Sequence, residues 1–352
     1  MNIKAAIRLI MTIALLATGI HRSEAFSLAL DSIAQMGKFP AFVIKTYRWG
    51  DTFFNGYDTT YVKGAGHKFN VKLLTNTWVD NYNFDLQDNM SMRLQSDPST
   101  TVGVRLTYLA VSVGYDKNLN KFFGSDAGAK RQFSFGFNCS LFAFNMYWSK
   151  NEVGTKINKF GQSGHTFNPN LDFRDGVTEE KGLNFYYFFN HKKYSQAAAF
   201  SFSRIQTRSQ GSFFAGLSYS WQRFNFNFGN LPHYILSHFP EQWTDYRYYA
   251  TSRDYTFKLG YGYNWVFHRR WLLAVSESPS IGLRHGYINS DERRNTFALS
   301  NQFKLSLIWN KGEWFAGLIG ELNTNLIVDK DNSFSTNIGN ICATVGYRFD
   351  IW

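Results

Sequence analysis

The sequence predicts an all-β chain that closes into an antiparallel transmembrane β-barrel of about 14 strands, with 12 strands as the alternative. Long segments alternate apolar and polar residues. Beyond Ile20, no run of residues is apolar for long enough to form a membrane helix, which needs about 18. Of the 352 residues, 18% are aromatic and 18% are charged, whereas soluble globular chains have about 25% charged residues. A barrel that meets lipid with every second residue has this composition.

The alternation is clearest between Arg253 and Trp265. Its odd-numbered residues from Tyr255 to Trp265 are all apolar or aromatic, and the even-numbered residues are polar or glycine. A period of two places each set on one face of a strand. Segments 296–309 and 341–351 repeat the pattern. These segments exceed the five or six residues usual in soluble sheets and approach the ~9 to 11 of a tilted membrane strand.

The predicted strands and links follow from counting back from the C-terminus. The segments lie near 334–352, 313–327, 294–309, 271–285, 252–266, 223–229, 211–219, 195–204, 182–190, 141–149, 131–138, 110–117, 101–107 and 88–96. Short links then fall at one end, and the long links 118–130, 150–181 and 230–251 fall at the other, as in outer-membrane barrels. Segment 223–229 is the weakest. Alternatively, Lys68–Leu74 joins the wall and a weak strand is lost.

Three regions are predicted along the chain. Residues 1–25 have the order of a signal peptide: Lys4 and Arg8, an apolar stretch from Leu9 to Ile20, and small residues before a cleavage site at Ala25. Residues 26–87 form an N-terminal segment in or under the lumen, where they could plug it. Residues 88–352 form the barrel, which we place in the outer membrane of a Gram-negative bacterium.

The stretch Asp58–Val62, the segments Gly103–Tyr108 and Val111–Tyr115, and the aromatic C-terminal strand carry a resemblance. On these residues the chain resembles an uncharacterised Bacteroidetes-type outer-membrane β-barrel family, classed as a domain of unknown function. The resemblance implies the barrel fold and its location, and no activity. The end of the chain also resembles the signal read by the barrel-assembly machinery, although Trp352 is one position out of phase with the apolar row ending at Ile351.

The sequence shows no mark of a known barrel enzyme, cofactor site or metal site. No histidine of residues 26–352 has a serine two residues later, the spacing that would aim both at one face of a strand. Asp329 with Asp331, and His233 and His238 with Glu241, are weak metal-like groups in predicted loops. Cys139 and Cys342 are expected to be lone thiols, although they could pair. We expect no cofactor, and an enzyme is the less favoured reading.

The formal net charge of +11 points to a basic interior. Strand parity assigns to the lumen the basic residues Arg93, Arg105, Lys258, Lys304 and Arg348 and the acidic residues Asp254, Glu321 and Asp350. A wet lumen of this kind would favour anions, but the same charges could instead pair and close it. The aromatics expected at the membrane interface are Trp265, Phe267, Trp271, Trp309 and Trp314.

These features favour passage or binding of small anionic solutes. One alternative is a lipid- or lipopolysaccharide-modifying enzyme whose residues converge from separate strands, with Ser300 and His285 as candidates. Another is a structural or adhesive barrel acting through a loop such as Lys150–Lys181. The expected partners are outer-membrane lipid, lipopolysaccharide and the barrel-assembly machinery. Nucleic acid is excluded by location, and a monomer is expected.

Overall fold

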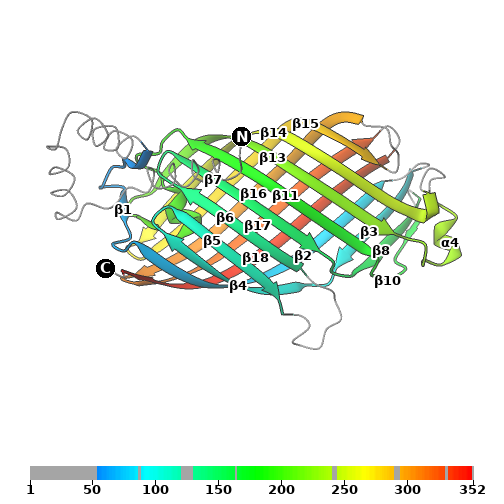
Figure 1. The fold of residues 1–352 in the computed structure, drawn as a ribbon, viewed down its shortest axis with the longest axis horizontal. Coiled ribbons are helices and arrows are strands. Elements are labelled where there is room, and N and C mark those ends of the chain that lie inside the picture. The colour runs from blue at the N-terminus through cyan, green and yellow to red at the C-terminus, as the bar shows by residue number, and fades with distance from the viewer. Residues whose placement is uncertain are drawn as a thin grey trace, which may run out of the picture.

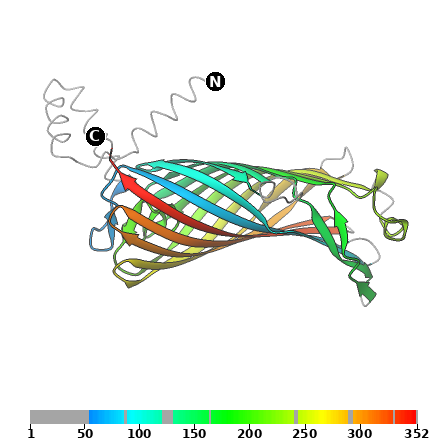
Figure 2. The same cartoon turned by 90° about the horizontal axis from the view of Figure 1, so that it is seen from below.

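The computed structural model describes residues 54–85, 89–119, 130–162, 165–239, 244–288, 294–329 and 332–350. Within these ranges, twelve antiparallel strands form a closed ring, drawn as a barrel longer than it is wide (Figure 1, Figure 2). The predicted signal peptide and residues 26–53 lie outside the described ranges, as do Ile351 and Trp352.

The ring strands follow one another in chain order around the wall. They are β2 (Phe69–Asp85), β4 (Ser99–Tyr108), β5 (Val111–Asn118), β6 (Lys130–Asn138), β7 (Phe142–Asn151), β11 (Gly176–Phe188), β13 (Gln210–Asn227), β14 (Arg247–His268), β15 (Trp271–Ile288), β16 (Arg294–Lys311), β17 (Trp314–Asp329) and β18 (Asn332–Phe349). The ring closes because β2 pairs with β18 on one side, Val71 opposite Tyr347, and with β4 on the other, Val71 opposite Leu106.

Smaller elements lie off the ring. They are β1 (Val62–Gly64), β3 (Met90–Ser96), β8 (Thr155–Gln162), β9 (His165–Phe167), β10 (Leu171–Phe173), β12 (Arg204–Gln206), a π-helical turn (Ala197–Ser201), α4 (His233–Leu236) and a 3-10 turn (Thr244–Tyr246). In the described part of the chain, no helix is long and apolar enough to cross a bilayer.

The count of twelve matches the alternative and corrects the fourteen strands first expected. Segments 211–219 and 223–229 form one strand, β13, because its polar interruption at Ser220 and Gln222 faces the lumen. Segment 195–204 is not in the wall, and segment 88–96 becomes β3, outside the ring. The boundary at residue 88 is wrong, and the alternative in which Lys68–Leu74 joins the wall is confirmed, because β2 closes the barrel and belongs to it.

The two ends of the barrel differ as the link lengths predict. The links Tyr108–Val111, His268–Trp271 and Lys311–Trp314 share one end with the last residue of β18; we call this the turn end. We call the opposite end the loop end. There the last residues of β2 pair with β3 instead of β4, and β3 in turn pairs with β8. The segment Lys150–Lys181 contributes β8, β9 and β10. Together with β3 these strands form a small sheet, which we call the forked sheet, beside α4 (Figure 1).

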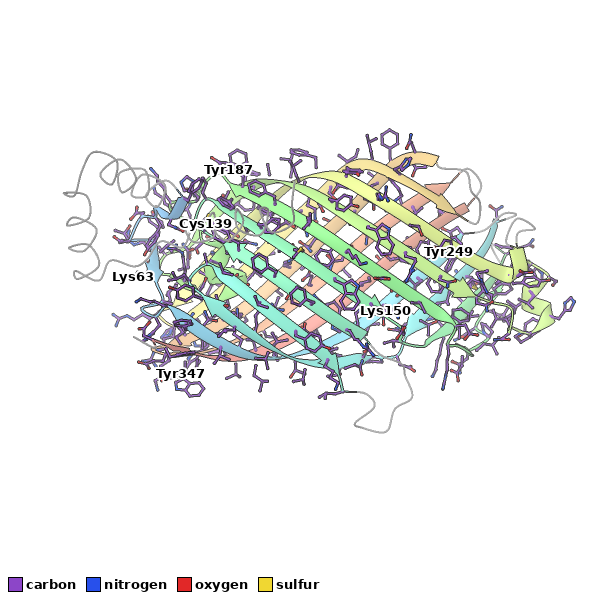
Figure 3. The ribbon with its side chains drawn as sticks, in the orientation of Figure 1. Lys63, Cys139, Lys150, Tyr187, Tyr249 and Tyr347 are labelled. Atoms are coloured by element: carbon purple, nitrogen blue, oxygen red, sulfur yellow. The ribbon has the colours of Figure 1, made fainter. Side chains whose placement is uncertain are left out.

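The barrel exterior is apolar, as a wall in contact with lipid requires. Along β14, Tyr255, Leu259 and Trp265 are 56%, 56% and 51% exposed, whereas Asp254 and Asn264 on the alternate face are buried. Tyr187 and Tyr347 lie near the turn end, and both side chains are exposed (Figure 3). In the alternating segments, the apolar residues therefore face outward and the polar residues face the lumen.

A carboxylate interrupts the apolar exterior on β15. Glu277 is exposed on the outward face of β15, between the exposed side chains of Val275 and Ile281. The amide nitrogen of Asn301 donates a hydrogen bond to Glu277 Oε1 at 3.2 Å. A carboxylate on a lipid-facing wall costs free energy that depends on its depth.

We expect Glu277→Leu to raise the free energy of unfolding by about 1 kcal/mol, because it removes this carboxylate from lipid. Urea-induced unfolding in phosphatidylcholine vesicles, followed by tryptophan fluorescence, measures the change. Glu321→Leu is the control, because it removes a lumenal carboxylate and should lower the stability. A stability unchanged or lowered by Glu277→Leu would contradict the lipid-facing placement.

Candidate functional site

The turn end of the lumen is closed by the connection between β11 and β13, residues 189–209, which we call the plug. Instead of forming a wall strand, it turns inward and buries Tyr194, the alanines Ala197–Ala199 and Phe202. Phenylalanine and serine alternate from Phe200 to Ser203 and imitate a strand in the sequence, but Ala197–Ala199 and Phe202 are buried inside the barrel instead. The prediction that residues 26–87 supply the plug is therefore wrong for the described residues.

Side chains of the wall hold the plug by donating hydrogen bonds to its backbone carbonyl groups. Lys72 Nζ donates to Ser201 O at 2.8 Å, Ser306 Oγ to Ala199 O at 2.8 Å, and an Arg348 guanidinium nitrogen to Phe202 O at 2.9 Å. Asn264 Nδ2 donates to Ser195 O at 3.0 Å. Carbonyls at the end of a helical turn lack partners within the turn, and the donors to Ala199, Ser201 and Phe202 supply such partners.

The described N-terminal residues fasten the plug from outside the ring. Strand β1 pairs with β12 of the plug, Val62 opposite Gln206, in a separate two-stranded sheet. The Asp58 backbone N–H donates to Lys192 O at 2.8 Å, and the Thr207 N–H donates to Tyr61 O at 2.7 Å. Hydrogen bonds from Thr60 lower the pKa of Asp58. The N-terminal segment therefore contacts the closure without forming it.

The loop end is closed by aromatic side chains. Phe84 of β2 and Phe334 of β18 have ring centroids 4.7 Å apart, and Phe84 lies 5.1 Å from Tyr248 of β14. Phe226 of β13 packs on Tyr82 at 5.2 Å. Strands β3, β8 and β10 and helix α4 add apolar residues to the same buried cluster. The inward rows of these ring strands are thus aromatic near the loop end and polar further along.

A polar cavity of about 390 Å³ lies between the two closures. Its charged lining residues are Lys72, Arg105, Lys130, Lys258, Arg284 and Lys304 on the basic side, and Glu180, Asp254 and Glu321 on the acidic side. Serines contribute much of the remaining lining, including Ser276, Ser278 and Ser280 of β15. This volume is within the range of small-molecule sites.

Most of the cavity charges form pairs. Arg284 binds Asp254 through two hydrogen bonds, Nε to Oδ1 at 2.7 Å and NH2 to Oδ2 at 2.6 Å. Lys304 lies 3.6 Å from Glu321. Lys130 lies 3.2 Å from both oxygens of Asp80 and packs over the Trp78 ring. Arg105 is 4.0 Å from Asp116.

Lys258 differs from these cations because its contacts are neutral. Its Nζ donates to Asn184 Oδ1 at 3.0 Å and to the Tyr186 hydroxyl at 3.5 Å. Among the described residues, no carboxylate lies within 4 Å of it. Glu180, also in the lining, accepts its hydrogen bonds from the hydroxyl of Tyr147 at 2.6 Å and from Gln222. Lys258 can therefore bind an incoming anion without first losing an ion pair.

The structure places the predicted lumenal residues in several environments. Arg105, Lys258, Lys304, Asp254 and Glu321 line the cavity. Arg348 faces inward but is buried beside the plug, with its guanidinium 4.4 Å from the centroid of the Phe315 ring. Parity along single strands found these inward positions. It missed Glu180, Arg284 and Lys130, although the period of two contained the same information for their strands.

Two predicted positions are wrong. Arg93 lies on the outward face of β3, because this strand leaves the ring and forks away from the wall. Asp350 follows the end of β18 and accepts hydrogen bonds from the Lys68 backbone at 2.8 Å and the His67 ring at 3.0 Å. The Lys68 hydrogen bond lowers the pKa of Asp350. Neither residue reaches the lumen.

The predicted interface aromatics gather at the turn end. Trp265, Phe267, Trp271 and Trp314 are exposed, and Trp309 is partly buried opposite Trp271. The rings of Trp265 and Phe267 are 5.4 Å apart, and those of Trp314 and Tyr347 are 5.0 Å apart.

The structure separates the candidate catalytic pair. Ser300 faces the cavity, where its hydroxyl lies 2.5 Å from that of Ser280. His285 faces outward on β15 and contacts the side chain of Asn295 at 2.6 Å. Residues on opposite faces of the wall cannot act on one substrate. Both cysteines are free thiols, and burial raises the pKa of Cys139, in the turn after β6, to about 11.

The weak metal-like groups gain no support from the described residues. Within those ranges, no three His, Cys, Asp or Glu side chains gather as a metal site. Asp331 and Glu241 lie outside the described ranges.

A family model described as a domain of unknown function, DUF4421, matches residues 56–349. The chain belongs to the DUF4421 family. The match runs from the residues that fasten the plug to the last residue of β18, so the family unit contains the whole ring, both closures and the cavity. No curated protein matches the chain.

Solved structures with some likeness to this DUF4421 chain are bacterial outer-membrane proteins. The outer membrane protease OmpT from Escherichia coli is 8% identical with a TM-score of 0.37, over 80% of this chain and 96% of that chain. The translocator domain of the autotransporter NalP from Neisseria meningitidis is 11% identical with a TM-score of 0.37, over 81% and 89%. An outer membrane channel from Pseudomonas putida F1 is 10% identical with a TM-score of 0.30, over 82% and 97%. These values carry no argument about function.

Gly317→Ala should loosen the plug. A Cβ at this inward position of β17 would lie 2.5 Å from the Phe202 ring, which is itself 5.2 Å from the Phe315 ring. Overpacking of this kind lowers the free energy of unfolding by about 1 to 3 kcal/mol. Gly320→Ala on the same strand is the matched control, since a Cβ there meets nothing within 4 Å. Equal urea midpoints for the two variants would contradict the prediction.

Asp254→Asn should destabilise the barrel by about 3 kcal/mol, because it leaves the buried Arg284 guanidinium without its carboxylate. Adding Arg284→Met to this variant should recover part of the loss, since the unpaired charge is removed as well. Denaturant unfolding of the two single variants and the double variant measures the coupling. Additive losses would show that the two side chains do not act as a pair.

Proposed function

We propose that this chain is an outer-membrane barrel that binds a small anionic solute in its lumen as a step in the passage of that solute. The observation that carries the proposal is Lys258, a cation in a polar cavity whose contacts in the described chain are an amide and a phenol. A carboxylate or phosphate entering the cavity would gain a charge-assisted hydrogen bond there.

The cavity composition suits a small solute with several polar groups. Serine hydroxyls and the amides of Asn145, Asn184 and Gln302 line the same space. Asp254 and Glu321 in the same lining are paired with Arg284 and Lys304, and Glu180 accepts hydrogen bonds from Tyr147 and Gln222. The size of the cavity, about 390 Å³, limits the solute to a small molecule.

Both closures would have to give way for passage. The plug is one connection held to the wall by side-chain donors, whereas the aromatic cluster is built from ring strands and the forked sheet. Moving the plug requires the exchange of these hydrogen bonds for bonds to water and the exposure of a few buried side chains such as Phe202, whereas opening the aromatic cluster requires the wall strands themselves to separate. We therefore assign the gating role to the plug.

The outer-membrane location rests on the apolar exterior and on the sorting of link lengths. Barrels in that membrane have short turns on the periplasmic side, so the turn end and the plug would face the periplasm. The barrel-assembly machinery, lipid and lipopolysaccharide are the partners this location implies. The signal peptide proposed for residues 1–25 would deliver the chain there.

Lys258→Gln should weaken the binding of small anions by about tenfold or more, the scale of one hydrogen bond to a charged group. Calorimetric titration of the detergent-solubilised full chain with inorganic phosphate and with succinate measures the affinity. Lys117→Gln is the control, because Lys117 is exposed on β5 outside the cavity lining. No binding of either anion, or equal affinities in both variants, would overturn the proposal.

A further inference from the structure

A second recess lies outside the barrel at the loop end. It has a volume of about 720 Å³ and is bounded by the outward faces of β18, β2, β3 and β8 together with β9. We call it the rim groove. Its residues include the amides Asn81, Asn83 and Asn337, the cations Arg93 and Lys159, and the half-exposed ring of Phe167. The described lining residues include no acidic side chain.

The two cations of the rim groove face each other across neighbouring strands. Arg93 of β3 is in register with Lys159 of β8, and like charges placed directly opposite repel. In the described chain, neither one contacts a carboxylate, whereas Lys156 on the same strand lies 3.9 Å from Asp97. An anion between Arg93 and Lys159 would turn this repulsion into attraction.

Polar side chains extend from the cations across the outer wall. In the register of the sheet, Gln95 lies opposite Asn81, Asn81 opposite Asn337, and Asn337 opposite Thr324. This row of amide and hydroxyl groups can donate to and accept from sugar hydroxyls. An exposed aromatic ring, here Phe167, offers an apolar face for a sugar ring to stack on.

The rim groove lies at the edge of the lipid-facing surface. On β18, the outward residue Ile341 is 59% exposed four positions closer to the turn end than Asn337. On β17, the exposed Leu322 precedes Thr324 by two positions. A lipid headgroup in the rim groove would therefore have its acyl chains beside an apolar wall.

We propose that the rim groove binds the phosphorylated sugar headgroup of an outer-leaflet lipid. Arg93 and Lys159 take the phosphate, and the amide row takes the sugar hydroxyls. The acyl chains lie along the wall near Ile341 and Leu322. This assignment rests on the proposed outer-membrane location. It gives Arg93 a role on the lipid side of the barrel instead of in the lumen.

The test compares two pairs of cations on the full chain in detergent micelles. Arg93→Gln/Lys159→Gln removes the rim-groove pair. Lys117→Gln/Arg131→Gln is the matched control, because Lys117 of β5 and Arg131 of β6 are also in register at exposed positions, and neither lines the rim groove or the cavity. The probes are diphosphorylated lipid A, its dephosphorylated form and the deacylated phosphorylated sugar, and native mass spectrometry measures their binding.

We expect the rim-groove variant to bind diphosphorylated lipid A about tenfold or more weakly than the unaltered chain, the scale of a lost charge-assisted contact. The control pair should change little, and the other two probes should bind weakly to every protein. Equal losses in both double variants would show general charge attraction and overturn the proposal. So would tight binding of the deacylated sugar, which would assign the groove to a soluble glycan.

Two measurements on the same samples separate this proposal from the proposed function. Heat-modifiable migration on a gel shows whether each variant is a folded barrel, and the loss of phosphate affinity caused by Lys258→Gln reports on the cavity. If both are normal while lipid A binding does not depend on Arg93 and Lys159, the rim-groove assignment fails alone. If unaltered protein lacks heat-modifiable migration or anion binding, the proposed function fails.

Discussion

The central constraint on this molecule is that a ring of twelve strands must have a filled or hydrated interior. Backbone groups in lipid need partners, and a closed ring supplies them because every strand has two neighbours. Small rings are filled by their own side chains, and large ones are open. Twelve strands lie between these cases, and the inward side chains alone leave space. The plug and the aromatic cluster occupy the two ends, and the polar cavity is what remains between them.

This constraint explains why the interior changes character along each strand. Near the turn end, inward residues such as Ser306 and Asn264 act as donors to the carbonyls of the plug. Near the loop end, aromatic rings pack together under the forked sheet. Between them, charged side chains form pairs because an unpaired charge away from bulk water is costly. Lys258 and Lys72 depart from that rule, but Lys72 donates to the Ser201 carbonyl of the plug, so Lys258 is the cation on which the proposed function rests.

The fork at β2 connects the barrel to its outer surface. By pairing with β4 near the turn end and β3 near the loop end, β2 places a second small sheet against the wall. One face of this sheet buries Met92 and Ile157 in the aromatic closure, while the other carries Arg93 and Lys159. In the ring, alternate residues of a strand face lipid or the lumen. In β3 and β8, alternate residues face the aromatic cluster or the rim groove.

The sequence by itself determined the barrel class, the side of the wall each residue takes along β14, β16 and β18, and the sorting of short and long links. These depend on a period of two and on turn chemistry, which are local properties. It also contained the alternative of twelve strands. Only the tertiary structure decided which segments pair, because pairing is a contact between residues far apart in the chain. That is why β2 closes the ring, why residues 189–209 close one end of the lumen although segment 195–204 reads as a strand, and why Arg93 lies outside. The period of a strand determines which residues share a face. The sheet that the strand joins determines whether that face meets lipid, the lumen or another part of the protein.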